Sequence, residues 1–279
     1  MSSIGAIGNS LSSYMSLTKS DVDSTNPNAS QAPDSSASSA SAAAPATTPK
    51  PSKDITVIAK PSGATTKSFA DVTVDARAAL SANEAKMKES GHVLGMGENQ
   101  GTQADVDFAF AGLDRRSLYA IASNSGGKFS QDEQTFAQVA MGQQQTTAMG
   151  LDNPSAFISD PTAGFLAGIK FLDSVSTEEK SSDNWRANRA ALQADYQSEV
   201  SQHPGTKAEN VDSGDPVVNM LANAIKNAAG TKYSFVSDGY ITDLSKLSFF
   251  SDSKNASALQ QARNQIAQTG SQSRIDLFV

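Results

Sequence analysis

The sequence contains no cysteine, only two histidines and a single tryptophan. The missing cysteines exclude disulfide bonds, thiolate metal sites and cysteine nucleophiles. The two histidines, His92 and His203, lie far apart in expected loops and outside any HExxH zinc pattern. The GxSxG turn that carries a serine nucleophile in many hydrolases is missing as well. These absences remove the common catalytic constellations, and we expect the protein not to be an enzyme.

Long apolar runs and basic clusters are also missing. No stretch approaches the roughly 20 apolar residues that a helix needs to cross a bilayer, so we expect no membrane span. The net charge is −7, acidic and basic residues are interspersed, and the densest basic cluster is Arg115-Arg116. A protein that binds nucleic acid usually carries a basic stripe. We therefore expect no nucleic-acid partner.

The first quarter of the chain has almost nothing with which to build a core. Residues 24–53 include no Val, Ile, Leu, Met or aromatic residue and consist mostly of Ser, Ala, Pro and Thr. Burial of such a segment cannot offset the entropy lost on ordering it. The sequence thus predicts a disordered tail over 1–53 and one folded domain over 54–279.

The N-terminus also bears on localisation. Its first residues, "MSSIGAIGNSLSSYM", lack the basic and continuous apolar regions of a Sec signal peptide. The Ser-rich, weakly charged start is similar in composition to the N-termini of bacterial proteins exported by type III or flagellar-type systems. We expect a protein that is either cytoplasmic or exported without a cleavable Sec signal.

Apolar spacing and capping residues predict a mainly α-helical domain. Capping-box spacing occurs at Ser68, Ser130 and Ser176, and proline occupies the start of two further helical patterns at Pro161 and Pro216. The only strand-like segment is "KYSFVSDGYITDLSKLSFF" at 232–250, where a Ser-Asp-Gly turn separates two runs, so at most a short two-stranded β element is expected. The expected helices cover residues 68–90, 104–123, 131–150, 161–175, 176–203, 215–230 and 255–269.

The stretch "SNSGGKFSQDEQ" at 123–134, with its flanking helices, resembles a degenerate EF-hand over about a tenth of the chain. Aligning Gly127 with the sixth loop position places Phe129 at the eighth and Glu133 at the twelfth. The first position, usually Asp, falls on Ala122. The resemblance implies a weak calcium site whose oxygen ligands come from Asn124, the Lys128 carbonyl, Ser130 and Glu133.

Three interpretations of this stretch stay open: a plain helix-turn-helix, a metal-free relative of the EF-hand, and a calcium-binding loop. Two glycines and the box from Ser130 to Glu133 account for the turn without any metal. A second segment, "GYIT" at 239–242, parallels "GKFS" at 127–130. Since EF-hand loops pair through their eighth positions, the resemblance implies that Ile241 could lie beside Phe129.

The remaining motifs have structural explanations. The glycines of "LGMGENQG" at 94–101 predict a loop, because no strand precedes them and the phosphate-binding pattern is incomplete. The acidic pair Glu178-Glu179 lies in a first helical turn, where it favours the helix dipole. Trp185 and the pair Phe249-Phe250 are expected in the core.

These observations favour a non-catalytic interaction or structural protein with a protein partner and no cofactor. We expect the partner to bind the Gln-rich helix at 131–150 and the apolar C-terminal tail "SRIDLFV". The alternatives are an EF-hand-like module that responds to calcium, and a bacterial exported protein or effector.

Overall fold

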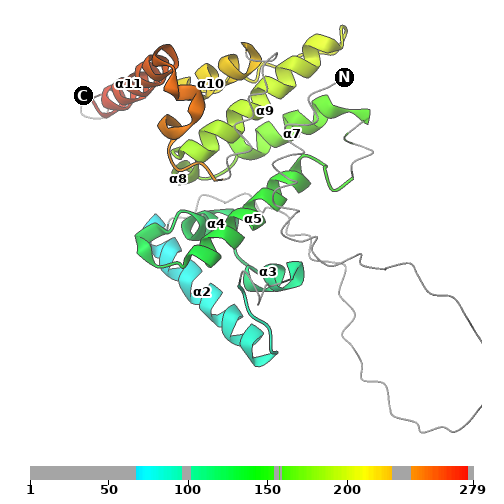
Figure 1. Ribbon diagram of the computed structural model, residues 1–279, viewed down its shortest axis with the longest axis vertical. Helices are drawn as coiled ribbons and strands as arrows, with labels where there is room; N and C mark the ends of the chain where they lie inside the picture. The colour runs from blue at the N-terminus through cyan, green and yellow to red at the C-terminus, as the bar shows by residue number, and fades with distance from the viewer. Residues whose placement is uncertain (1–66, 96–101, 154–156, 158, 228–239, 276–279) are drawn as a thin grey trace, which may run out of the picture.

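The computed structural model describes residues 67–95, 102–153, 157, 159–227 and 240–275, with side chains up to residue 268. Within these ranges the regular structure is helical and no residue is in a strand, which confirms the mainly α fold. The predicted tail at 1–53 and residues 54–66 lie outside the described residues. The helices form two groups, one above the other in Figure 1.

The N-terminal group comprises α2 (Phe69–Glu89), α3 (Gln103–Ala109), α4 (Arg115–Ala122) and α5 (Gln131–Ala148). Their apolar sides meet in one cluster, in which Leu80, Leu118 and Ile121 are fully enclosed. Helix α4 packs against both α2 and α5, so it forms the centre of this group.

The C-terminal group comprises α7 (Pro161–Asp173), α8 (Thr177–Lys180), α9 (Asp183–Gln202), α10 (Pro216–Asn227) and α11 (Ser253–Ile275). A second apolar cluster lies between α7, α9 and α10, and α11 packs on α10. Trp185 lies in this cluster and donates a 2.8 Å hydrogen bond to the Leu172 carbonyl, as expected of a core residue. Helix α5 contacts α7 and thereby joins the two groups.

The predicted caps are present where local sequence specified them. The hydroxyl of Ser68 accepts from the Asp71 N–H at the start of α2, and Ser90 ends that helix. The box at the start of α5 is complete, because Ser130 and Glu133 each accept from the other's backbone N–H. These helix boundaries are confirmed.

The single helix expected over 104–123 is wrong. The chain leaves helical geometry after Ala109 and begins again at Arg115. Gly112 has φ +77°, a left-handed conformation that costs glycine little, and the Asp114 carboxylate accepts from the Ser117 N–H. A turn and a new cap therefore interrupt the apolar periodicity.

The described part of the strand-like segment, residues 240–250, also differs from the expected β structure. Residues 240–251 contain two short 3-10 helices, η4 (Leu244–Lys246) and η5 (Ser248–Ser251). The Asp243 carboxylate accepts from both the N–H and the hydroxyl of Ser245, which starts η4. The first of the two expected runs, before residue 240, lies outside the described residues.

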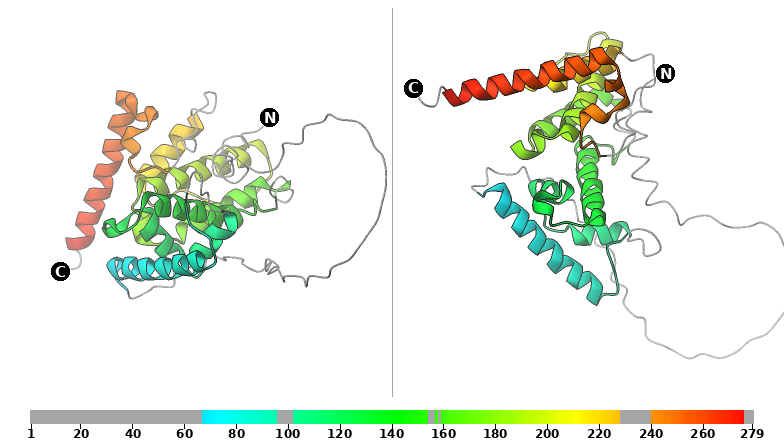
Figure 2. Two further views of the ribbon diagram at one scale, coloured as in Figure 1. Left: turned by 60° about the horizontal axis from the view of Figure 1, so that its bottom comes forward. Right: turned by 60° about the vertical axis from the view of Figure 1, so that its left-hand side comes forward.

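Helix α11 is longer than the expected 255–269, because it runs from Ser253 to Ile275. The right-hand view of Figure 2 shows its red end extending away from the other helices. Among the described helices, none is long and apolar enough to cross a membrane.

Candidate functional site

The loop between α4 and α5 reverses the chain through left-handed residues. Asn124 has φ 50°, and Gly126 and Gly127 have φ values of 68° and 66° within the short helix η2 (Ser125–Gly127). The Asn124 carboxamide oxygen accepts from the Phe129 N–H at 3.0 Å. A second hydrogen bond, from the Gly127 N–H to the Asn124 carbonyl at 2.9 Å, also closes the loop, and the buried Phe129 ring anchors it.

Two of the other oxygen groups suggested by the EF-hand resemblance, the side chains of Ser130 and Glu133, already have protein partners. Ser130 accepts from the Glu133 N–H, and Glu133 Oε2 accepts from the Ser130 N–H at 2.7 Å. Glu133 Oε1 lies 2.6 Å from Nη1 of Arg77 on α2. Lys128 follows η2 with an exposed side chain. In the described part of the chain, no three His, Asp or Glu side chains lie close enough to hold a metal ion.

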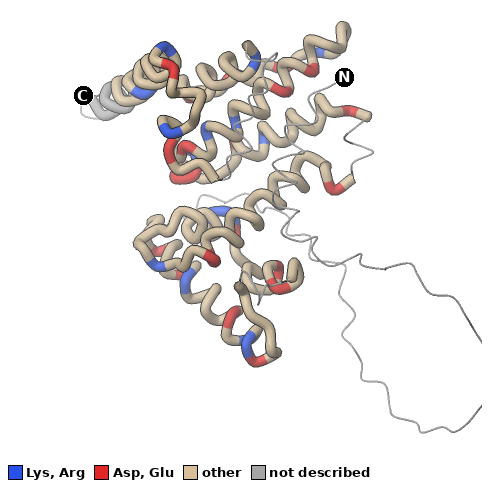
Figure 3. Tube along the Cα trace, viewed as in Figure 1, with Lys and Arg blue, Asp and Glu red and all other residues tan. Residues whose placement is uncertain are grey.

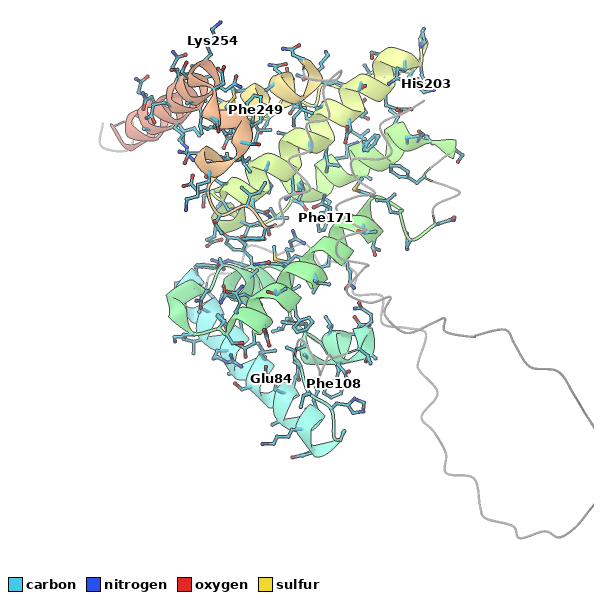
Figure 4. The ribbon with its side chains drawn as sticks, viewed as in Figure 1. Glu84, Phe108, Phe171, His203, Phe249 and Lys254 are labelled. Atoms are coloured by element: carbon cyan, nitrogen blue, oxygen red, sulfur yellow. The ribbon has the colours of Figure 1, made fainter. Side chains whose placement is uncertain are left out.

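Arg77 lies between two carboxylates of the N-terminal group. Its guanidinium pairs with Glu133 at 2.6 Å and with Glu84 at 3.0 Å, and it stacks over the Phe129 ring with 5.4 Å from Cζ to the centroid. Figure 4 shows Glu84 on α2. This cluster fixes the α4–α5 loop against α2, a role that the sequence did not indicate.

The two carboxylates of the cluster titrate differently. Burial, reinforced by a hydrogen bond with Glu133 and repulsion from it, raises the pKa of Glu84 to about 7, although Arg77 opposes the shift. Burial also acts to raise the pKa of Glu133, but hydrogen bonds from Arg77 and from the Ser130 backbone hold it below its ordinary value. The cluster therefore keeps one carboxylate charged and one protonated over part of the acidic range.

Ile241 of "GYIT" and Phe129 of "GKFS" do not pair with each other. The Ile241 N–H donates to the Asn184 carboxamide at 3.1 Å, whereas the Phe129 N–H donates to Asn124. Ile241 belongs to the C-terminal apolar cluster and Phe129 to the N-terminal one. Each residue thus serves its own group of helices.

The two histidines are exposed and lie in different groups of helices. His92 Nδ1 is 2.8 Å from Asp105 Oδ1, at the end of α2, and His203 follows α9 beside Glu199. Figure 4 shows His203 at the far end of the C-terminal group. The structure does not bring the histidines together.

The basic pair Arg115-Arg116 and the acidic pair Glu178-Glu179 meet between the two groups of helices. Arg115 Nη2 is 2.6 Å from Glu179 Oε1, and both side chains are almost fully enclosed. Arg116 Nη2 is 2.5 Å from Glu178 Oε1. Arg115 is therefore buried although it belongs to the densest basic cluster of the sequence, and the two glutamates form ion pairs in addition to favouring the helix dipole. We call these four residues the Arg-Glu clamp.

Further contacts surround the clamp. Arg115 donates to the Met141 carbonyl at 2.6 Å and lies over the Phe171 ring, with 5.2 Å from Cζ to the centroid. Figure 4 shows Phe171 between the two groups of helices. The hydrogen bond from Arg116 lowers the pKa of Glu178. The sequence carries no local signal for the clamp, because more than 60 residues separate its basic and acidic pairs.

The exposed glutamines lie mainly on α11. In α5, where a Gln-rich binding face was expected, Gln144 is buried. On α11, the buried side chains among the described residues are Leu259 and Ala262. The exposed amide side chains of α11 up to residue 268 are Gln260, Gln261, Asn264, Gln265 and Gln268. Figure 3 shows that acidic and basic positions are interspersed over the described helices.

No model of a known protein family matches the chain, and comparisons with curated proteins and with solved structures also find no match. The function must therefore follow from the residues and their contacts.

Proposed function

We propose that the protein is a non-catalytic interaction protein, and that α11 presents its binding surface to a protein partner. The observation that carries this proposal is the placement of α11. It is attached to the C-terminal group by side chains between Leu259 and Ile266, and its last turns extend beyond them to the end of the helix at Ile275 (Figure 1).

The attachment of α11 is confined to one side. Leu259 and Ala262 are buried against the C-terminal group, and Arg263 Nη2 lies 2.9 Å from Asp183 Oδ2 on α9. The side chains at 264, 265, 267 and 268 are exposed. Packing within the chain therefore holds one side of the helix as far as Ile266, which lies against the C-terminal apolar cluster, and leaves the opposite side exposed.

A projecting polar helix has little intrinsic stability. Isolated helices shorter than about 12–15 residues are marginal in water, and most helix stability in proteins comes from packing of an apolar face. The second half of α11 is rich in Gln and Ser and includes Gly270, which lowers helix propensity by about 1 kcal/mol relative to alanine. A partner that packs along this half would supply the missing stabilisation.

The chemistry of α11 indicates the kind of partner. Exposed carboxamides offer both donors and acceptors, and the sequence after Arg274 reads "IDLFV", which adds apolar side chains. A segment of chain that offers apolar anchors beside amides is suited to a groove on another protein. The C-terminal part of the interaction surface expected from the sequence is thus retained, with α11 replacing α5 as its Gln-rich element.

The interior charges support a role without catalysis, because they are used to join elements. Arg189 is 1% exposed, and its guanidinium binds Asp173 at 2.7 Å, Gln193 at 3.1 Å and the Val211 carbonyl at 2.9 Å. Arg115 is used in the same way within the Arg-Glu clamp. Both guanidiniums act as structural connectors between segments far apart in the chain.

Site-specific cross-linking in the native cell tests the proposal. A photoreactive residue at Gln268 is expected to capture one protein, and a synthetic peptide of residues 253–279 is expected to compete with that capture. The matched control is the same residue at Gln202, an exposed glutamine in the last turn of α9. Equal capture from both positions, or none from Gln268, would overturn the assignment of α11.

A further inference from the structure

Helix α2 packs one side on the N-terminal group and leaves the opposite side exposed, with one large hydrophobic residue, Val74, on that exposed side. The inner side buries Val72, Ala76, Leu80 and Met87. On the other side, Val74 is 52% exposed, more than any other large hydrophobic residue described in the structure. Figure 2 shows α2 along an edge of the molecule, so this outer side faces away from the other helices.

The outer side carries a regular row of residues. Along α2 they are separated alternately by three and four positions, the spacing by which two helices pack along their length. All of them are exposed. The row consists of Asp71, Val74, Ala78, Ser81, Ala85 and Lys88.

The row has apolar or small side chains in its middle and opposite charges at its ends. Val74, Ala78, Ser81 and Ala85 allow close approach of a second helix, and the ends are negative near the N-terminus and positive near the C-terminus. Asp71 accepts a hydrogen bond from the Ser68 hydroxyl through one oxygen, Oδ2. A partner that matches this row must itself carry a positive end opposite Asp71 and a negative end opposite Lys88.

A second copy of the same helix meets that requirement in the antiparallel direction. We propose that two copies of this chain associate through the outer sides of α2, in antiparallel orientation. In one register, Asp71 lies opposite Lys88 of the second copy and Val74 lies opposite Ala85 of the second copy. The same register places Ala78 opposite Ser81 of the second copy, so the row is complementary to itself over its full length.

The charges select the orientation. Parallel helices would place Asp71 beside Asp71 of the second copy and Lys88 beside Lys88 of the second copy, and like charges repel. The antiparallel arrangement replaces both repulsions by two equivalent attractions, as two-fold symmetry requires. The self-association surface therefore consists of one helix face, used identically by both copies.

The length of the face sets the expected strength. A helix of 21 residues is about 31 Å long. One helix pair of this length buries an area at the low end of specific interfaces, which begin at about 1,200 Å² in total. We expect a dimer that dissociates on dilution through the micromolar range.

Charge exchange in the full-length protein provides the test, with sedimentation equilibrium as the readout. Asp71→Lys places lysine opposite Lys88 twice in each dimer, and Lys88→Asp places aspartate opposite Asp71 twice. Each single variant is expected to raise the dissociation constant at least tenfold. The double variant, and an equimolar mixture of the two single variants, are expected to restore dimers, because opposite charges then face each other again.

Two further variants separate the dimer contact from effects on folding. Val74→Asp is expected to abolish dimerisation, whereas Lys254→Asp on α11 is expected to leave it unchanged. Circular dichroism and melting temperature verify that each variant keeps its helices. A wild-type chain that stays monomeric at several hundred micromolar, or dimers that resist both single exchanges, would overturn the proposal. A large loss of stability for Val74→Asp in a monomeric wild type would show instead that another segment of the chain covers this face.

Discussion

Replacing Arg115 by methionine tests whether the buried ion pair with Glu179 stabilises the fold. The two side chains are 7% and 5% exposed, and the guanidinium also binds the Met141 carbonyl. Methionine keeps an unbranched side chain with good helix propensity, but it leaves the Glu179 carboxylate buried without its partner. Removing one partner of a buried ion pair costs about 3–5 kcal/mol. We expect Arg115→Met to lower the free energy of unfolding by this amount.

The neighbouring arginine provides a matched control in the same turn of α4. The Arg116–Glu178 pair is more exposed, at 11% and 26%, so water can solvate the glutamate when the arginine is removed. More exposed pairs contribute about 1 kcal/mol or less. The same substitution, Arg116→Met, should therefore cost several-fold less than Arg115→Met.

Urea denaturation monitored by circular dichroism measures both effects. A double variant, Arg115→Met with Glu179→Met, should be more stable than Arg115→Met alone, because apolar replacement of a whole buried pair is often neutral or stabilising. If Arg115→Met costs no more than Arg116→Met, or if the double variant shows the sum of both single losses, the pair does not stabilise the fold as reasoned above.

Three further predictions follow from other contacts. Because the pKa of Glu84 is raised from 4.5 to about 7, the carboxyl loses its proton at a lower pH in the unfolded chain than in the folded protein, and the free energy of unfolding should fall between about pH 4.5 and 7. Glu84→Gln should make this fall smaller, which urea denaturation at pH 5 and pH 7.5 would measure. The same fall in the wild type and the variant would contradict the assignment. Gly164→Ala should destabilise the fold by about 1–3 kcal/mol, because the new methyl group would lie 2.4 Å from the Phe157 ring. The control Gly142→Ala meets no atom within 4 Å and should stabilise the fold by up to about 1 kcal/mol in thermal melts. The opposite order of the two variants would be inconsistent with the packing of α7. Millimolar calcium should leave the melting temperature unchanged, because the Glu133 carboxylate already accepts hydrogen bonds from the protein on both oxygens; a clear rise would favour the calcium-responsive alternative.

The features that could be predicted were those encoded within a few residues. Ser68 and Ser130 reach the N–H groups three positions ahead, and Pro161 starts α7 with its fixed φ. The turn at Gly112 was missed, because the apolar spacing continued through it and the capping role of Asp114 depends on the chain bending there. The helical fold class was predictable, since many such local signals agree.

In the candidate site, too, the features encoded by neighbouring residues could be predicted, whereas the contacts between distant residues could not. The turn of the loop at 122–133 followed from its glycines and its capping box. The engagement of Glu133 by Arg77 did not follow, because those residues are 56 positions apart and meet only when α2 packs against α4 and the η2 loop that precedes α5. An expected metal ligand thus became one end of an ion pair, and no pattern within the loop could have shown this.

Local sequence was sufficient to specify where α2, α5 and α7 begin, since caps and prolines act on neighbouring backbone groups, but it did not show the breaks that separate α3 from α4 and α8 from α9. The packing of helices was needed to distinguish a buried arginine from a solvated one, and a covered helix face from a free one. Arg115 and Arg116 are adjacent in sequence, but Arg115 is enclosed by α5, α7 and α8 while Arg116 stays closer to solvent. The physical reason is that burial and charge pairing depend on segments that are distant along the chain and become neighbours only in the folded protein.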